Sequence, residues 1–438
     1  KANSPYIVTG NVIVENGARL TIEPGVKLLF DGAYSLQING ELLAEGTVAD
    51  SIYFISNKTN PSRVDWNGIK FNDLSDFWTS VNSLKYCVIE WVDNGVSTAN
   101  TSGINISNTT LRNINDYGIN NGNSEVVISD CVIYNFRYGA IYNSGGNINL
   151  SSVDIYQGVD GGNQIDYIGS GTGVTSRNNA LVEISNSEIK MCSRGIGGYG
   201  RPFPVYNIYN NIITENEHGI YFSGSDDTRG VVIADIHNNN IFNNTEYDLY
   251  THASQNTHAD QVNATNNWWG TTDMYQVGLN QIYDDADHVS SPNVKFVPFL
   301  DDAFDNGGVS TSSNYVQGWL DEATSWPAGT HRMVGNVYAG SNTLTIDAGA
   351  RIEVSGPYKI QSENSLFING TAENKVVFTS GQPEPKANDW QGFFFVQPCD
   401  DFDNLLTGSQ AFQYLGGERF LSYPRQKFLD DFEVHICF

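Results

Sequence analysis

A short turn recurs along the first 250 residues, and this recurrence constrains the fold more than any other feature of the sequence. In each copy an aromatic or charged residue precedes glycine, and aspartate replaces the glycine once. Apart from one long insertion, the copies are spaced about 21 to 29 residues apart. This period predicts stacked coils of a three-sided β-solenoid, because one coil of such a fold takes about that length. The copies are Tyr117-Gly118, Tyr138-Gly139, Arg194-Gly195, His218-Gly219 and Tyr247-Asp248.

Small polar residues stand at a nearly constant distance before these turns. At a tight bend, each side-chain amide or hydroxyl can bond the equivalent group one coil above and below. We therefore predict a polar ladder along one corner of the solenoid, and Tyr86-Cys87 fits the same register before Gly95. The ladder pairs are Thr109-Thr110, Asp130-Cys131, Asn186-Ser187, Asn210-Asn211 and Asn239-Asn240.

Between the ladder and the turn, apolar residues alternate with polar ones, as in Val132-Ile133 and Ile212-Ile213. This alternation is typical of strands that bury one face. The chain holds 43 glycines, 23 tyrosines and 22 phenylalanines, and we find no convincing long amphipathic helix. We therefore predict an all-β fold built from short strands and turns.

The opening of the chain is repeated 324 residues later. Leu20-Thr-Ile-Glu-Pro-Gly-Val26 returns as Leu344-Thr-Ile-Asp-Ala-Gly-Ala350, and Asp65-Trp-Asn-Gly returns as Asp389-Trp-Gln-Gly. We therefore predict a first solenoid at residues 1–300, a linker at 301–330 and the start of a second solenoid copy at 331–396. Residues 397–438 lose the ladder pattern, and we expect this atypical tail to be non-native.

Charge and composition narrow the partners. The net charge is −26, from 23 Lys+Arg against 49 Asp+Glu, which repels phosphate backbones and argues against nucleic acid and anionic membranes as partners. No apolar run reaches the about 18 residues of a membrane span. None of the five cysteines forms a Cys-x-x-Cys pair, which disfavours a zinc site. The chain begins at Lys1, so we interpret it as a mature secreted or cell-surface protein that has lost its export signal, and we expect a monomer.

Several motifs resemble a known family. They are Gly10-Asn-Val-Ile-Val14, Leu20-Thr-Ile-Glu-Pro-Gly-Val26, Trp66-Asn-Gly-Ile69, Asn266-Asn-Trp-Trp-Gly-Thr271 and Val294-Lys-Phe-Val-Pro-Phe-Leu300. Together with the coil repeat, they resemble bacterial extracellular right-handed parallel β-helix repeat proteins of the carbohydrate-active, pectate-lyase-like superfamily. The resemblance implies a right-handed parallel β-helix and a polysaccharide ligand, but the superfamily includes lyases, hydrolases, binding modules and adhesins.

Hydrolysis of a glycan needs a carboxylic acid facing a carboxylate, about 5 Å apart for retention and about 6.5 to 9.5 Å for inversion. One coil rises by roughly the strand spacing of about 4.8 Å, so carboxylates in one column match these distances. Glu217 and Glu246 occupy the same column of successive coils, two residues before the turn Gly or Asp. We predict that Glu217 performs acid–base catalysis with Glu246, Asp160, Asp166 or Asp226 as its partner.

Two loops interrupt the regular coils near these carboxylates, at residues 157–178 and 197–204. Loops on a rigid scaffold commonly carry function, and aromatic rings suit the apolar faces of sugars. We therefore predict a groove near these loops in which aromatic, basic and imidazole side chains orient the glycan. The predicted substrate-binding residues are Arg194, Tyr199, Arg201, His218, Tyr221 and Tyr167.

The leading interpretation is a glycoside hydrolase that acts on an extended plant or microbial polysaccharide, because carboxylates outnumber well-placed basic residues. A non-catalytic carbohydrate-binding module needs only an aromatic and polar groove. A polysaccharide lyase would need an arginine or lysine base near Ca²⁺-binding carboxylates, and a surface adhesin or spacer would need no groove. No cofactor is required by the leading interpretation, and a role for Ca²⁺ stays open.

Overall fold

A computed structural model gives the fold. It describes residues 2–72, 82–101, 103–157, 171–199, 204–223, 233–252, 261–288, 291–312, 314–395 and the backbone of 412–414. The chain forms two compact units. The first consists of residues 1–254, 267–270 and 303–307, and the second consists of residues 255–266, 271–302 and 308–438.

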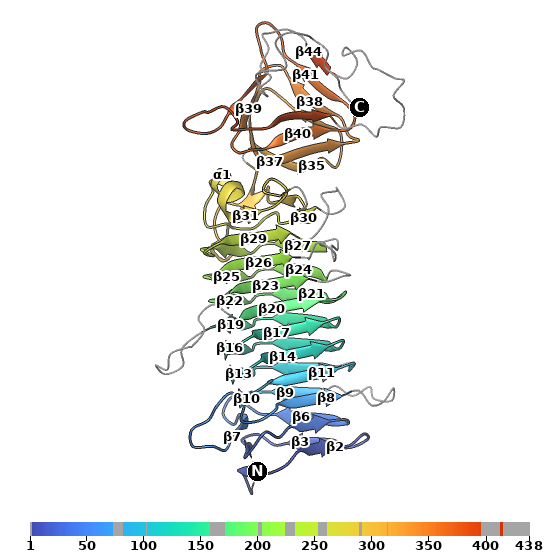
Figure 1. Cartoon of the computed structure of the whole chain (residues 1–438), viewed down its shortest axis with the longest axis vertical. Coiled ribbons are helices and arrows are strands. Elements are labelled where there is room, and N and C mark those ends of the chain that lie inside the picture. The colour runs from blue at the N-terminus through green and yellow to red at the C-terminus, as the bar shows by residue number, and fades with distance from the viewer. Residues whose placement is uncertain are drawn as a thin grey trace. The chain divides into compact units, whose positions relative to one another are not determined.

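The first unit is a parallel β-helix in which each coil contributes one strand to each of three sheets, A, B and C (Figure 1). Neighbours within a sheet are every third strand of the chain, and the described strands of this unit pair in parallel, for example β13 with β16 and β14 with β17. The predicted all-β solenoid is therefore confirmed.

Sheet A consists of β1 (Tyr6–Val8), β4 (Lys27–Phe30), β7 (Ile52–Ser56), β10 (Cys87–Val92), β13 (Thr110–Ile114), β16 (Val132–Phe136), β19 (Asp154–Tyr156), β22 (Glu188–Lys190), β25 (Ile212–Thr214) and β28 (Asn240–Phe242). Sheet B in this unit consists of β2 (Val12–Val14), β5 (Leu36–Ile38), β8 (Ile69–Asn72), β11 (Val96–Ala99), β14 (Tyr117–Gly122), β17 (Gly139–Ser144), β20 (Thr172–Arg177), β23 (Arg194–Tyr199), β26 (His218–Ser223) and β29 (Tyr247–His252). Sheet C in this unit consists of β3 (Arg19–Ile22), β6 (Glu41–Glu45), β9 (Asn82–Lys85), β12 (Ile104–Ser107), β15 (Glu125–Ser129), β18 (Asn147–Ser151), β21 (Leu181–Ser185), β24 (Val205–Tyr209) and β27 (Ile233–His237), and η3 (Phe304–Asn306) is a short helical turn.

Stacked aliphatic residues fill the interior of the first unit. On sheet A the parallel register places one apolar side chain of each coil directly over the next, and all of them are fully buried. Burying each such side chain contributes about 1.5 to 3 kcal/mol, which makes this column a main source of stability. The column is Ile89, Leu111, Ile133, Ile155, Ile189, Ile213 and Ile241.

Asparagines shape the corners of the coils. The residue before each ladder position has a positive φ, as in Asn108 (47°), Asn186 (51°) and Asn238 (54°). Asparagine adopts this left-handed conformation more readily than most residues. Among the described residues, fourteen of the twenty non-glycine residues with positive φ are asparagine, so the corner geometry accounts for much of the asparagine richness.

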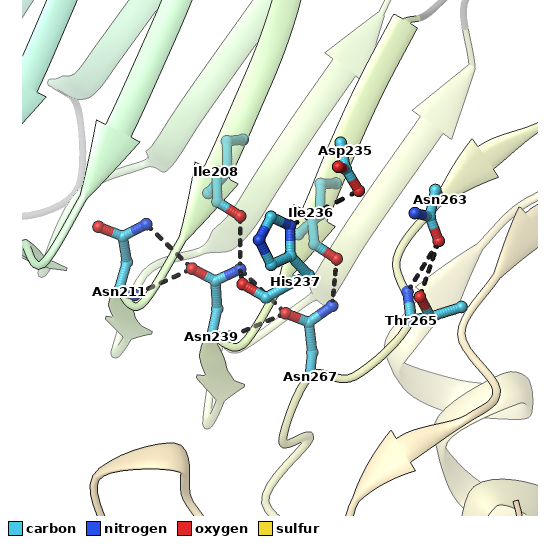
Figure 2. Close-up of polar contacts among 9 residues, drawn as sticks. All are labelled: Ile208, Asn211, Asp235, Ile236, His237, Asn239, Asn263, Thr265 and Asn267. Carbon is cyan, nitrogen blue, oxygen red and sulfur yellow. Dashed lines mark hydrogen bonds and ion pairs between the residues drawn. The ribbon is translucent and has the colours of Figure 1, made fainter. Parts of the chain in front are cut away.

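The predicted polar ladder is present. The Oδ1 atom of Asn211 accepts a hydrogen bond from the backbone N–H of Ser187 (3.0 Å). In the same way, Oδ1 of Asn239 accepts from the backbone N–H of Asn211 (2.9 Å), and Oδ1 of Asn267 accepts from that of Asn239 (2.9 Å). Figure 2 shows Asn211, Asn239 and Asn267 in this line. In the pair Thr109-Thr110, the first residue belongs to the ladder, and Thr109 lies opposite Cys131 of the next coil. The ladder residue shifts within the pair because the segment from ladder to turn is one residue longer in some coils.

The recurring turn also needs one adjustment. Strand register places Tyr117 opposite Gly139, and Gly118 therefore lies opposite Ala140, one position away from the sequence alignment. Several turns require glycine because the backbone of the next coil lies too close for a side chain. A Cβ atom on Gly195, for example, would lie 2.6 Å from the carbonyl oxygen of Gly219 in the next coil. Coil stacking thus explains why glycine recurs.

The second unit is also almost entirely β. Its longest strand pairs in parallel with three neighbours, and a separate four-stranded sheet has the order β36-β38-β41-β44. Its core includes Met333, Val337, Ile346, Ile352 and Ile360. The elements are β30 (Val262–Asn263), α1 (Met274–Gln276), η2 (Val277–Gln281), β31 (Ile282–Tyr283), β32 (Val294–Lys295), β33 (Phe299–Leu300), β34 (Ser310–Thr311), β35 (Tyr315–Trp319), β36 (Thr324–Trp326), β37 (Gly329–Gly340), β38 (Leu344–Asp347), β39 (Ala350–Val354), β40 (Lys359–Ser362), β41 (Leu366–Asn369), β42 (Val377–Ser380), β43 (Gly392–Phe395) and β44 (Phe412–Tyr414).

The two copies of the repeated opening segment share local contacts. In the first unit the Ser56 hydroxyl donates to Asp65 (2.6 Å), and the backbone N–H of Ser62 donates to the same carboxylate (2.8 Å). In the second unit Ser380 and the backbone of Lys386 donate to Asp389 at 2.5 Å and 2.8 Å. The repeated sequence therefore builds the same serine–aspartate turn twice.

Candidate functional site

Outward-facing side chains of sheet B gather into a strip of tyrosines, arginines and one histidine. The strip covers six consecutive strands of the sheet, β14, β17, β20, β23, β26 and β29. On β26, for example, the outward-facing Tyr221 lies between two buried residues, Ile220 and Phe222. We call this set the tyrosine strip. Its members are Tyr117, Tyr142, Arg177, Arg194, Tyr199, His218, Tyr221, Tyr247 and Tyr250.

Four members pack closely in the part of the strip formed by β23, β26 and β29. The rings of Tyr221 and Tyr250 are stacked with centroids 4.5 Å apart and planes 3° from parallel. The guanidinium carbon of Arg194 lies 3.9 Å from the Tyr221 ring centre, which is a close cation–π contact. The His218 ring lies 4.9 Å from Tyr221 and 5.7 Å from Tyr250.

This stacking determines what the rings present to solvent. Tyr221 and Tyr250 are register partners on neighbouring strands, and their 4.5 Å separation is close to the strand spacing of about 4.8 Å. The ring planes therefore lie across the coil axis, and Arg194 and Tyr250 occupy the two faces of Tyr221. We expected ring faces open for stacking on sugars, whereas Tyr221 offers its edge.

The part of the strip formed by β14, β17 and β20 repeats this arrangement. Tyr117 stacks on Tyr142 with centroids 4.9 Å apart, and Arg177 lies 5.4 Å from the Tyr142 ring centre. Tyr199, which projects from β23, makes a side-chain hydrogen bond with Tyr142. Burial, followed by the bond to Tyr199, raises the pKa of Tyr142, so the Tyr142 phenol is protonated at neutral pH.

Neither arginine of the strip forms an ion pair with a described residue. Arg177 donates to the Ser144 hydroxyl (3.2 Å), but among the described residues neither Arg177 nor Arg194 has a carboxylate partner. Ion pairs lie on other faces of this unit, as between Arg112 and Glu90 on sheet A (2.5 Å). Both guanidinium groups of the strip lie against tyrosine rings instead.

The two glutamates predicted as catalytic are neighbours. The backbone N–H of Glu246 donates to the carbonyl of Glu217 (2.8 Å), which places them in one column of successive coils. Both side chains are exposed at the border of the strip, next to His218 and Tyr247. Burial lowers the pKa of His218, and Arg194 lowers it further while Glu217 and Glu246 raise it. His218 is therefore neutral at physiological pH.

Five predicted site residues lie outside the described residues: Asp160, Asp166, Tyr167, Arg201 and Asp226. Their catalytic and substrate-binding roles stay predictions. Within the described part of the chain, no group of three or more His, Cys, Asp or Glu residues is arranged to hold a metal ion. The same part contains no helix that is long and apolar enough to cross a membrane.

The sequence predicts four of the nine strip members as site residues; Tyr117 and Tyr247 are predicted only as turn residues, and three further members are not predicted. Tyr142, Arg177 and Tyr250 lie at outward positions of β17, β20 and β29, and register places Tyr142 and Tyr250 in the row of Tyr221. Counting forward from each turn would have found Tyr221 and Tyr250, because both stand three residues after the first turn residue. Arg177 lies inside the segment 157–178 that the sequence predicts as a loop, whereas the structure places it at the end of β20, and the insertion before this strand hides the count.

The parallel sheets and their coil-by-coil register define a parallel β-helix protein with a tyrosine strip on one face. A family model described as the right-handed β-helix region matches residues 67–231, so the predicted right-handed parallel β-helix is confirmed. One curated relative is protein bark beetle of Drosophila melanogaster, which is 46% identical over 52 residues. The match covers 12% of this chain and 2% of that protein.

Proposed function

We propose that the protein binds an extracellular polysaccharide along the tyrosine strip. The supporting observation is that six consecutive coils each contribute an outward hydroxyl, guanidinium or imidazole group to one face. Sugar hydroxyls need such donors and acceptors, and Arg177 and Arg194 add charged donors that no described carboxylate occupies. A secreted or cell-surface, monomeric protein is part of this proposal.

Affinity electrophoresis through gels that contain neutral or uronate polysaccharides tests the binding. We expect at least one polysaccharide to retard the protein, and Tyr221→Ala to weaken that retardation about tenfold or more in apparent Kd. Tyr156→Ala is the matched control, because it removes a stacked tyrosine from sheet A instead. Equal retardation of wild type and Tyr221→Ala by every binding polysaccharide would rule out the strip as the site.

Hydrolysis is the second candidate function, and the column of Glu217 and Glu246 favours it. One coil separates the two residues, and that spacing of about 4.8 Å is close to the about 5 to 5.5 Å that retaining glycosidases use. The leading alternative to hydrolysis is elimination, in which an arginine such as Arg194 would act near the acidic sugar.

Product analysis separates these reactions. New reducing ends without ultraviolet absorbance would indicate a hydrolase, and absorbance from an unsaturated product would indicate a lyase. For a hydrolase, we expect Glu217→Gln and Glu246→Gln each to lower kcat about a hundredfold, while Glu125→Gln on sheet C has no effect. Retardation without any product would leave binding as the function, and full activity in both glutamine variants would exclude this pair.

A further inference from the structure

We infer that the first coil of the first unit is a docking surface for one more coil. Its occupant is a segment equivalent to residues 315–326 of this chain, supplied by another repeat of the same kind. The surface consists of β1, β2 and β3, which lie at the ends of sheets A, B and C. This inference does not depend on the proposed function of the tyrosine strip.

The three strands of the first coil are edge strands. Among the described residues, β1, β2 and β3 each have a neighbour on one side only, namely β4, β5 and β6. Backbone N–H and C=O groups on the open side of an edge strand can pair with an added strand. Such a strand would continue the parallel pairing that joins all the other coils of this unit.

The core is also open at this end. Val12 of β2 pairs with Leu36, which is fully buried, so the Val12 side chain faces the core. Val12 is nevertheless 37% exposed, and Leu20 of β3 is partly exposed. In a stack of coils, an apolar core needs cover at both ends. An added coil would supply that cover.

The second unit contains the same coil. Gly335-Asn-Val337 repeats Gly10-Asn-Val12, and the strand registers of the two coils agree at three positions. The matching pairs are Tyr6–Leu28 with His331–Ile352, Val12–Leu36 with Val337–Ile360, and Leu20–Leu42 with Leu344–Leu366.

Residues 315–326 cover this coil in the second unit. β35 pairs in parallel with β37, and β36 pairs in parallel with β38, so the segment forms one further coil. Trp326 belongs to the core of this unit, and Val316 and Leu320 pack against that core. The segment therefore adds both strands and apolar side chains.

This cover accounts for the difference in burial between the two coils. Gly318 of the segment pairs with Val337, and Thr324 pairs with Leu344. Val337 and Leu344 are fully buried, whereas their counterpart Val12 is 37% exposed. The second unit thus shows which kind of segment completes a coil of this sequence.

A fusion chain tests the inference. An added copy of residues 314–329 is placed directly before Pro5, which takes the position of Thr330 in the repeat. We expect amides of β1, β2 and β3 to exchange at least about tenfold more slowly than in the original chain, because these strands become inner strands. Hydrogen exchange read by mass spectrometry measures this, and unchanged exchange would overturn the inference.

Two variants within the added copy test whether the segment docks in the inferred register. Trp326→Ser removes the side chain that would enter the core, and we expect it to abolish most of the protection. Ser325→Ala is the matched control, because Ser325 is exposed. Full protection in Trp326→Ser would contradict the register. The original coils keep their own sequence in both variants.

Sedimentation velocity of the original chain identifies the alternative occupant. We expect a sedimentation coefficient that does not change with concentration, because the chain has no free end segment of this kind to offer. Concentration-dependent association that the fusion abolishes would instead identify a second whole copy as the occupant. That result would overturn the assignment to a segment equivalent to residues 315–326.

Discussion

Asp248 is the one acid that occupies a position held by glycine in neighbouring coils. It lies opposite Gly219, is 2% exposed, and accepts from the side-chain amide of Asn244 (2.7 Å). Its second oxygen, Oδ2, has no hydrogen-bond partner in the part of the chain that the structure describes. Burial raises the pKa of Asp248 from 3.8 to about 7.

This pKa predicts a pH-dependent stability. Because the folded chain holds the Asp248 proton more tightly than the unfolded chain, the contribution of this group to stability is fully present below about pH 4 and is lost as the pH rises through about 7. We expect Asp248→Asn to raise the free energy of unfolding by roughly 2 kcal/mol at pH 8 and to change it little at pH 4. Urea denaturation at both pH values measures this, and an equal effect at both would contradict the assignment.

Asn239 is the most highly bonded residue of the ladder. Its amide nitrogen donates to the carbonyl of Ile208 (2.8 Å), and its oxygen accepts from both nitrogens of Asn211 (2.9 Å each) (Figure 2). We expect Asn239→Ala to lower the free energy of unfolding by about 2 to 4 kcal/mol, because buried donors lose their acceptor. Denaturation of Asn207→Ala, an exposed residue of β24, is the control. A loss below about 1 kcal/mol would mean that the ladder contributes little.

At the scale of elements, each coil depends on corners with left-handed backbone. Asn238, between β27 and the ladder residue Asn239, has a φ of 54°. This bend lets the chain pass from a strand of sheet C to a strand of sheet A without breaking the stack. Asn210, with a φ of 57°, makes the same bend one coil earlier.

The corner predicts opposite effects of two substitutions. Glycine adopts positive φ freely, so Asn238→Gly should change the free energy of unfolding by less than about 1 kcal/mol. A β-branched side chain is strained there, so Asn238→Val should cost roughly 1 to 2 kcal/mol more than glycine. Thermal unfolding of the two variants measures the difference, and similar melting temperatures would contradict the proposed backbone strain.

At the scale of the whole molecule, the first unit is a one-dimensional stack. Each coil pairs only with the coils before and after it, as β13 does with β10 and β16. Stability in such a stack is approximately a sum of coil and neighbour contributions. The first two strands, β1 and β2, each have two exposed residues out of three, among them Ile7 and Ile13, which are both 48% accessible.

This architecture predicts graded protection from hydrogen exchange. We expect amides of β1, β2 and β3 to exchange through local opening, at least tenfold faster than those of β13 to β24. Native-state exchange measured by mass spectrometry tests this prediction. Uniform protection across these strands would indicate that the first unit unfolds only as a whole.

Much of the fold could be predicted from the sequence because its determinants are local and periodic. The turn glycines, the polar ladder and the alternating aliphatic residues repeat with each coil, so one coil predicts the next. The duplicated segment likewise specifies its own serine–aspartate turn around Asp65 and around Asp389. Similarly, Glu217 and Glu246 share a column because equal spacing from the turn aligns them.

Only the tertiary structure decided which outward side chains meet. Tyr199 reaches Tyr142 across an intervening strand, and Arg194 lies over Tyr221 from the neighbouring coil. Coil lengths also vary by a residue, which shifts Gly139 from its aligned position. The sequence by itself determined the solenoid, since stacking identical coils repeats each local contact. The site required the three-dimensional register, because it is built across coils by side chains that are far apart in the chain.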